Sequence, residues 1–287
     1  NNTLFSFVFT ARFSVALAYD MLSCPGVVNL TYQGTIGGVG FLAPVLDLAD
    51  SSDFLLQTSM LTTEGHQKFK AQFDAMRMLF AQHNSTLYPL VIGMLFQTIF
   101  AAGPNETKTL FQNLTLYNSH ASPLYTERPA SMLLSFGLAD RPEFKAIIHA
   151  GVNNSLQYAN KSLFMSLALD WLRDITPSVE YVLNNTRVLF YNGQLDALFP
   201  SVNSQAYYDK LNWTHAEDYR NASRSLWEPY GQYIMPFGDK GPLVPISAAG
   251  YTKSAGNFTS AVVLGMGHYA GFDKPDEIYH LMMEFLD

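Results

Sequence analysis

A histidine near the end of the chain lies just past an apolar segment, on small and flexible residues. The alternating residues Thr259–Leu264 predict a strand, and Gly265-Met266-Gly267 then places His268 on a loop. A histidine just past a strand can reach across the top of a sheet and serve as a general base. The alternative interpretation is a structural histidine that caps the turn.

Asp196 is a second residue that could do chemistry, and it also follows an apolar segment. Arg187–Tyr191 is a compact run typical of a buried parallel strand, and the turn at 192–196 ends in this aspartate. Val202–Leu211 then has helical spacing. Strand, acidic turn and helix make one α/β unit, with the acid at the carboxyl end of the strand, where open sheets place functional groups.

Asp196 and His268 occur in the order acid, then histidine. In α/β hydrolases these two follow the nucleophile in that order. The acid fixes the imidazole tautomer and stabilises the imidazolium that forms during acyl transfer. The two residues therefore predict the acid and base of a catalytic triad.

The elements that position these residues alternate between strands and helices at both ends of the chain. Leu4–Phe9 and Val27–Ile36 have the composition of strands, and Arg12–Leu22 between them has helical spacing. Gly37–Gly40 is expected as a loop, and because no lysine follows it, a phosphate-binding role is disfavoured. Asp276–Leu286 is expected as a closing amphipathic helix.

The middle of the chain, about 62–185, is mainly helical in pattern. Glu64–His83 carries an apolar stripe that indicates core packing: Phe69, Phe73, Met76 and Phe80. A polar loop or lid is expected at 103–128, and further helices at Leu90–Ala102, Asp140–His149 and Ser162–Leu183, the last broken or kinked at Pro177. We therefore expect a single α/β domain over 1–287, with a mostly parallel sheet and a helical insertion or lid at about 62–185.

Composition limits the possible partners. The 287 residues are 48% hydrophobic with a net charge of −7, and the 17 basic residues form no cluster, so nucleic-acid binding is not expected. No apolar run is long enough and clean enough to predict a transmembrane segment. The chain has neither a start methionine nor a signal-like segment, so we expect a processed or partial chain.

Glycosylation sequons indicate the compartment. Eleven N-x-[S/T] sequences occur, a density that predicts a secretory-pathway glycoprotein, whether secreted, lysosomal or vacuolar, or on the extracellular surface. They begin at Asn1, Asn29, Asn84, Asn105, Asn113, Asn153, Asn160, Asn184, Asn212, Asn221 and Asn257. The single cysteine, Cys24, is either a buried thiol or a bridge to another polypeptide.

No metal and no cofactor are expected. Asp47, Asp50 and Asp53 do not complete a calcium-loop spacing and are interpreted as a solvated turn. The other histidines show no spacing such as H-E-x-x-H, and we interpret them as surface or core residues: His66, His83, His120, His149, His215 and His280.

Several stretches resemble the serine carboxypeptidase family, most of all its vitellogenic-like and lysosomal branch. YNGQLDALFP (191–200) is similar to the acid loop, and GYTKSAGNFTSAVVLGMGHYAGFDKP (250–275) to the histidine loop, whose family form is close to G-H-x-x-P-x-D-x-P. Two further stretches resemble family elements in the same order along the chain. The family's strand after the nucleophile helix is similar to VVNLTYQGTIGGVG (27–40), and its short helix before the acid strand is similar to EFKAIIHAG (143–151). The resemblance implies an α/β-hydrolase fold, Asp196 as triad acid, His268 as triad base, and release of C-terminal residues from peptides.

The chain departs from the family pattern at the nucleophile. The family has G-E-S-Y-[AG]-G before a helix that Arg12–Ala18 matches loosely. Counting back places Val8 in the nucleophile position and Phe7 where the family has a glutamate that helps bind the substrate's terminal carboxylate. Ser6 is two residues out of register, and Ser14 lies inside the helix.

The chain departs from the family pattern in two further ways, one small and one larger. Gly271 stands where the histidine motif has its first proline. The family's N-terminal portion, with several sheet strands and the glycine-rich oxyanion segment, is missing before Val8. A sheet without those strands exposes an apolar edge, so a companion polypeptide or oligomer contact is expected to cover it.

Three functions remain open. The first is a serine carboxypeptidase-like pseudoenzyme with a binding or structural role, because Asp196 and His268 without nucleophile and oxyanion hole cannot form an acyl-enzyme. The second is an active serine-type carboxypeptidase, acting on peptides, that a companion chain or a further N-terminal segment completes. The third is an acyltransferase, since the family that the chain resembles includes them.

Overall fold

A computed structural model gives the fold of the 287-residue chain. It describes residues 2–7, 9–26, 32–103, 105–151, 153–155, 166–167, 169–229, 232–234, 243–245 and 248–286. They form two compact units, Asn1–Leu55 with Ala121–Pro123 and Asp174–Asp287, and Leu56–His120 with Leu124–Arg173. Within the described ranges, no helix combines the length and apolar character that a membrane span requires.

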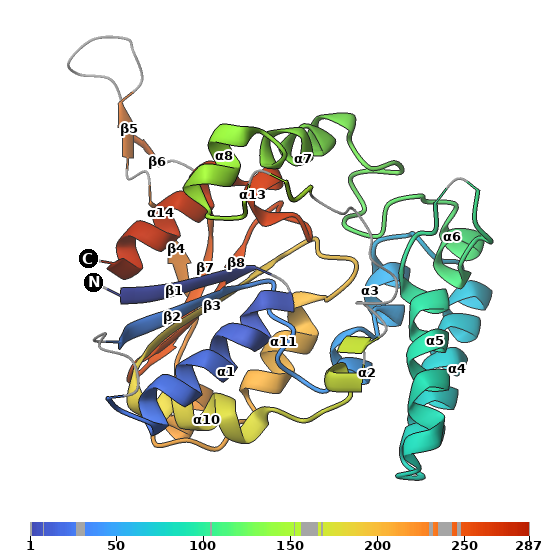
Figure 1. The fold of residues 1–287 in the computed structure, drawn as a ribbon, viewed down its shortest axis with the longest axis horizontal. Coiled ribbons are helices and arrows are strands. Elements are labelled where there is room, and N and C mark those ends of the chain that lie inside the picture. Colours follow the sequence, from blue (N-terminus) through green and yellow to red (C-terminus); the bar gives the residue numbers. More distant parts are fainter. Residues whose placement is uncertain are drawn as a thin grey trace. The chain divides into compact units, whose positions relative to one another are not determined.

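The first unit is built on a six-stranded sheet in the order β1-β2-β3-β8-β7-β4 (Figure 1). The first four strands are parallel, and β7 and β4 are antiparallel to their neighbours. The strands are β1 (Asn2–Phe7), β2 (Tyr32–Gly38), β3 (Arg187–Gly193), β8 (Phe258–Val263), β7 (Gly250–Ala255) and β4 (Ser225–Trp227). The predicted α/β class with a mostly parallel sheet is confirmed.

Helices cover both faces of this sheet (Figure 1). One face carries α1 (Phe9–Ser23), α10 (Thr176–Asn185) and α11 (Ser201–Tyr208), and the other carries α14 (Pro275–Leu286). Glycines in β2 permit the close approach: a Cβ at Gly34 would lie 2.9 Å from the Phe285 ring of α14, and one at Gly37 would lie 3.2 Å from Ala11 of α1. Successive side chains of a strand point to opposite faces, so these contacts assign the two layers.

The hydrophobic core has two parts, because successive strand side chains point to opposite faces of the sheet. Toward α14 the buried residues include Ile36, Leu189, Tyr191, Val263 and Leu281. On the opposite face, Phe258 stands at the centre of an aromatic cluster. Its ring centroid lies 4.9 to 6.0 Å from those of Phe190, Tyr208, Trp213 and Tyr219.

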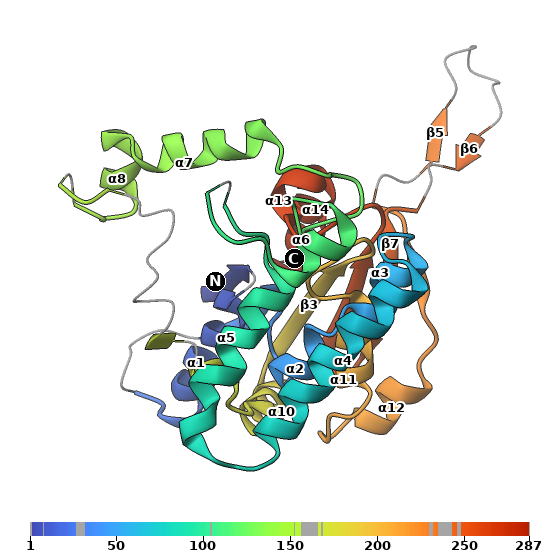
Figure 2. The same ribbon diagram turned by 90° about the vertical axis from the view of Figure 1, so that its right-hand side faces the viewer.

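The second unit is helical. Its elements are α4 (Thr63–Phe80), η1 (Ser85–Leu87), α5 (Tyr88–Ile99), α6 (Leu110–Thr115), η2 (Ala130–Leu133), α7 (Leu134–Ala139) and α8 (Pro142–Ile147). Helices α4 and α5 lie side by side (Figure 2). The Thr62 hydroxyl caps α4 by accepting from the Gly65 N–H at 3.0 Å. Phe69, Phe73 and Met76 are fully buried, as the predicted stripe requires.

Shorter elements complete the first unit. They are α2 (Val45–Leu48), α12 (Ala216–Asn221) and α13 (Ala270–Asp273), with α3 (Ser52–Gln57) at the boundary between the units. A separate hairpin pairs β5 (Gln232–Ile234) with β6 (Leu243–Pro245). The prediction of a solvated turn at three aspartates is wrong for Asp47, which lies in α2, and for Asp53, which lies in α3. Asp50 lies between these helices and accepts from the Ser52 N–H at 3.3 Å.

Some local predictions are wrong. The helix predicted over 162–183, of which residues 162–165 and 168 lie outside the described part of the chain, is broken and not kinked, because residues 172–175 are not helical. Pro177 lies in the first turn of α10, where a missing N–H costs nothing. β1 ends at Phe7 and α1 begins at Phe9, so the predicted strand is too long. Gly37 and Gly38 belong to β2 and not to a loop, because they pair with Phe190 and Tyr191 of β3. A Cβ at Gly38 would lie 2.3 Å from the Tyr191 ring.

Cys24 is exposed, so its interpretation as a buried thiol is also wrong. Residues 27–31 of the predicted second strand lie outside the described part of the chain, as does Val8.

Candidate active site

The structure brings Asp196 and His268 into contact. Strands β3 and β8 are neighbours and parallel, so their carboxyl ends and the loops that follow meet at one edge of the sheet. The imidazole Nδ1 of His268 lies 3.0 Å from Oδ2 of Asp196. Asp196 is 0% exposed and His268 is 4% exposed, so water is largely excluded from the pair.

The carboxylate of Asp196 is fixed on its other side. Its Oδ1 accepts hydrogen bonds from the backbone N–H groups of Leu198 and Phe199, both at 2.9 Å. These donors stabilise an ionised carboxylate, which then accepts from the Nδ1–H of His268. In that tautomer Nε2 carries the lone pair, so it is the atom that can take up a proton.

Backbone hydrogen bonds join the acid loop to the histidine loop. The N–H of Leu195 donates to Met266 O at 2.8 Å, and the N–H of Gln194 donates to Val263 O at 3.0 Å. The two loops approach so closely that a Cβ at Gly193 would lie 2.3 Å from Met266 O. Gly265 has a φ of +69°, which a glycine adopts without strain and a larger residue rarely adopts.

A third segment, which the sequence did not indicate as part of the site, touches both loops. The carbonyl of Ala121 accepts from the N–H of His268 at 2.9 Å and from the N–H of Ala197 at 3.4 Å. Ala121 and Ser122 are fully buried. The sequence placed them in a polar loop at 103–128, and a backbone carbonyl leaves no side-chain signature by which to find it.

An aromatic side chain packs beside the imidazole. The ring of Phe199 stands edge to face with that of His268, with centroids 5.4 Å apart. Phe199 in turn stacks on Phe41 at 5.7 Å. These rings restrict the orientations open to the imidazole.

The structure does not describe the candidate nucleophile position. Val8 lies between β1 and α1, outside the described residues, and Ser6 lies in β1. Ser14 lies within α1 and is buried. The order strand, single residue, helix is that of a nucleophile elbow in α/β hydrolases.

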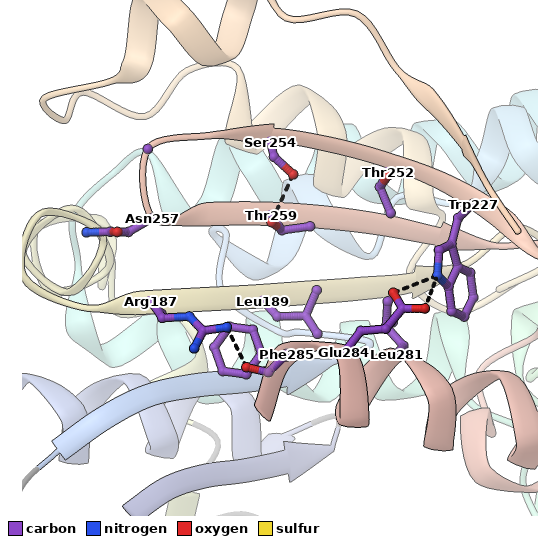
Figure 3. Close-up of a pocket in the computed structure, with 11 residues that line it drawn as sticks. Arg187, Leu189, Trp227, Thr252, Ser254, Asn257, Thr259, Leu281, Glu284 and Phe285 are labelled. Atoms are coloured by element: carbon purple, nitrogen blue, oxygen red, sulfur yellow. Dashed lines mark hydrogen bonds between the residues drawn. The ribbon is translucent and has the colours of Figure 1, made fainter. Parts of the chain in front are cut away.

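A pocket of about 370 Å³ lies at the opposite end of the same sheet (Figure 3). It lies between α14 and the strands β3, β7 and β8, far along those strands from Asp196 and His268. Its charged side chains already serve the docking of α14. Arg187 lies over the Phe285 ring at 4.7 Å, and the indole N–H of Trp227 donates to Glu284 at 2.9 Å. We therefore assign the candidate site to the Asp196–His268 edge.

The described sequon asparagines all lie at the surface: Asn84, Asn105, Asn113, Asn153, Asn184, Asn212, Asn221 and Asn257. The sequon residues Asn1, Asn29 and Asn160 lie outside the described residues. In the described part of the chain, no cluster of three or more His, Cys, Asp or Glu side chains could hold a metal ion.

Comparison with protein families gives a match over most of the chain. A family model described as serine carboxypeptidase matches residues 24–287. The match begins after β1 and α1, so it includes Asp196 and His268 but not Val8.

Curated relatives carry similar names. The venom serine carboxypeptidase of Apis mellifera is 24% identical over 90% of this chain and 51% of its own length. The probable serine carboxypeptidase CPVL of Homo sapiens is 22% identical over 90% and 51%. The vitellogenic carboxypeptidase of Aedes aegypti is 23% identical over 96% and 54%. The chain thus spans about half the length of the curated relatives it matches.

A solved structure shares the fold. A prohormone-processing carboxypeptidase from Saccharomyces cerevisiae superposes with a TM-score of 0.66 at 13% identity, covering 99% of this chain and 61% of the yeast chain. At that identity the likeness concerns the fold, which is that of an α/β hydrolase.

Proposed function

Because the chain belongs to the serine carboxypeptidase family, we propose that it is a serine carboxypeptidase-like glycoprotein that has no peptidase activity by itself. The observation that carries this proposal is that Val8 follows β1 and precedes α1 in the chain, the order in which a nucleophile elbow is built, and we assign it to the position of the family's serine. Valine has no atom that can attack a carbonyl carbon, so an acyl-enzyme cannot form at this position. The family match starts at residue 24, so the assignment of Val8 depends on the strand–helix order.

Asp196 and His268 are the proposed acid and base of this family site. Their 3.0 Å hydrogen bond and their burial support the assignment. In a complete site, Nε2 of His268 would take the proton of the attacking hydroxyl and later return it to the leaving amine, while Asp196 would hold the imidazole. Without the hydroxyl, the pair orients itself but has nothing to activate, which favours a binding or structural role.

A second candidate is an active serine-type carboxypeptidase that a companion polypeptide or a further segment completes. The specific observation in its favour is the geometry of the proposed acid–base pair, with both oxygens of Asp196 accepting hydrogen bonds and His268 almost fully buried. The chain also spans only about half of its relatives' length. Under this candidate the reaction is release of the C-terminal residue of a peptide.

The proposed compartment is the secretory pathway, with secretion, a lysosome or vacuole, or the cell surface as destinations. The exposed sequon asparagines support it, because N-glycans are added to accessible asparagines in that pathway. The name of the honeybee relative, a venom carboxypeptidase, is compatible with a secreted protein.

Labelling with a fluorophosphonate probe tests the proposal. The probe reacts with activated serines and is applied to the purified native glycoprotein, to His268→Ala and to the control His280→Ala. An inactive chain leaves all three unlabelled. A completed enzyme labels in the native protein and in His280→Ala but not in His268→Ala, and it shortens a blocked dipeptide by one residue. That second pattern contradicts the first candidate and establishes the alternative.

A further inference from the structure

Two acceptors hold the backbone of the histidine loop. The N–H of Gly267 donates to the Oδ2 carboxylate oxygen of Asp273 at 2.8 Å. The N–H of the next residue, His268, donates to the carbonyl of Ala121 at 2.9 Å. Two consecutive peptide N–H groups are therefore fixed by two different parts of the chain, the end of α13 and the Ala121–Pro123 segment.

The loop has little space in which to shift between these acceptors. A Cβ at Gly267 would lie 2.6 Å from Cβ of Ser122, 2.9 Å from Ala121 O and 3.0 Å from Oδ2 of Asp273. A residue with a side chain would displace one of these groups. The close packing and the two hydrogen bonds together determine where the Cα of His268 lies.

We propose that Asp273 is a positioning residue for His268. The inference rests on the proposed role of His268 as the base of the site. A carboxylate that accepts from a backbone N–H makes a shorter and stronger bond than a neutral acceptor does. Asp273 thereby fixes the Met266–Gly267 peptide, one peptide ahead of the one that carries the His268 N–H, and with it the 3.0 Å contact between Nδ1 and Asp196.

The competing interpretation is that Asp273 only stabilises the turn into α14. Under that interpretation, loss of the carboxylate lowers the unfolding temperature but leaves the Asp196–His268 hydrogen bond unchanged. The two interpretations differ in what happens to the Nδ1 proton, which proton NMR can detect directly.

The first readout is the low-field resonance of the His268 Nδ1 proton in the native protein, assigned by its absence in His268→Gln. We expect it to remain in Asp273→Asn, because the amide oxygen can accept from the same N–H, and to broaden or disappear in Asp273→Ala. The exposed neighbour Asp276 supplies the matched control, Asp276→Ala, which should keep the resonance. An unchanged resonance in a folded Asp273→Ala protein overturns the proposal.

If Asp273→Ala does not fold, Asp273→Glu replaces it, because the longer side chain moves the carboxylate by one methylene. We expect a shifted resonance in Asp273→Glu, and a resonance identical to that of the native protein overturns the proposal.

The second readout applies if the protein or its complex cleaves peptides. Misplacement of a catalytic group by about 1 Å can cost roughly 100-fold in rate, so Asp273→Ala should lower kcat by about 10- to 100-fold with little change in KM. A KM effect alone would contradict positioning. If the native protein is inactive, the proton resonance still decides the role of Asp273, so failure of the proposed function is distinguishable from failure of this inference.

Discussion

The position of Gly193 at the end of β3 depends on the absence of a side chain. A Cβ there would lie 2.3 Å from Met266 O and 2.5 Å from Gly267 O, both in the histidine loop. Gly193→Ala should therefore push the acid loop and the histidine loop apart and lower the free energy of unfolding by about 1–3 kcal/mol. Urea denaturation followed by circular dichroism measures the loss.

Gly271→Ala is the matched control for this substitution. A Cβ at Gly271 meets no atom within 4 Å, so its stability should stay close to that of the native protein. Equal stabilities for the two alanine variants would contradict the steric argument.

The pKa of Tyr219 makes the stability of the fold depend on pH in the alkaline range. Burial raises its pKa from 10.0 to about 12, although the hydrogen bond to Ser260 lowers it in part. Because the folded state holds the proton more tightly than the unfolded chain, this stabilisation is fully present below pH 10.0 and is lost as the pH rises toward about 12. Burial raises the pKa of Tyr208 as well, so both residues contribute.

Tyr219→Phe tests this dependence. The variant should lose unfolding free energy less steeply with pH than the native protein does between about pH 10 and 12. Urea denaturation across that range measures the slope. Tyr279 is 60% exposed, so Tyr279→Phe is the control. If the unfolding free energy of both variants fell with pH as steeply as that of the native protein, the assignment to Tyr219 would be contradicted.

At the residue scale, the sequence was sufficient to select Asp196 and His268, because each follows an apolar strand and lies in a recognisable motif. It did not select Ala121 or the N–H groups of Leu198 and Phe199, which act through the backbone. Asp273 was visible as part of the histidine motif, but its contact with Gly267 depends on the local fold. Whether the predicted pair is catalytic stays a prediction.

At the scale of elements, the aromatic cluster around Phe258 joins β8 to the helices on one face of the sheet. Phe258 is fully buried against Phe190, Tyr208 and Tyr219. Phe258→Ala should destabilise the fold by about 3–5 kcal/mol, since the cavity cannot fully collapse within so many rigid rings.

Thermal unfolding compares Phe258→Ala with Phe272→Ala. Phe272 lies in α13 and is 36% exposed, so its truncation should cost much less. A smaller decrease in unfolding temperature for Phe258→Ala than for Phe272→Ala would show that the aromatic cluster does not stabilise the packing of these helices on β8.

The sequence predicted strands and helices best where the apolar period was clear, as in β3, β8, α4 and α14. It failed where a tertiary contact decided the local structure. Gly37 and Gly38 look like loop residues, yet they form the end of β2 because they pair with Phe190 and Tyr191 of β3. Pro177 indicated a break or a kink, and the choice between them was open because the non-helical residues before Thr176 are not visible in apolar spacing alone.

At the scale of the whole molecule, we expect the exposed sequons to carry glycans. The native protein should exceed the 32.0 kDa of its polypeptide, and enzymatic release should convert each occupied asparagine to aspartate. Peptide mass spectrometry identifies the converted positions among Asn84, Asn105, Asn113, Asn153, Asn184, Asn212, Asn221 and Asn257. Absence of any conversion would contradict the secretory-pathway proposal.

The proposal of a companion polypeptide rests on the β1 edge of the sheet. Among the described strands, β1 pairs only with β2, and parallel strands are normally buried on both faces and along their edges. Helix α1, which follows β1, exposes Phe13 by 43% and Leu17 by 47%. Exposed apolar residues beside a strand with one edge free among the described strands favour the proposal that further polypeptide covers this surface.

We therefore expect the deglycosylated native protein to have a mass above 32.0 kDa under native conditions. Native mass spectrometry with and without reductant separates a non-covalent partner from one linked through the exposed Cys24. Leu17→Glu should weaken the association, because it places a charge on the covered surface. Leu226→Glu, at a 60% exposed leucine of β4 on the opposite edge, should not. A monomer of 32.0 kDa would remove the companion and leave Val8 as the decisive residue of an inactive chain.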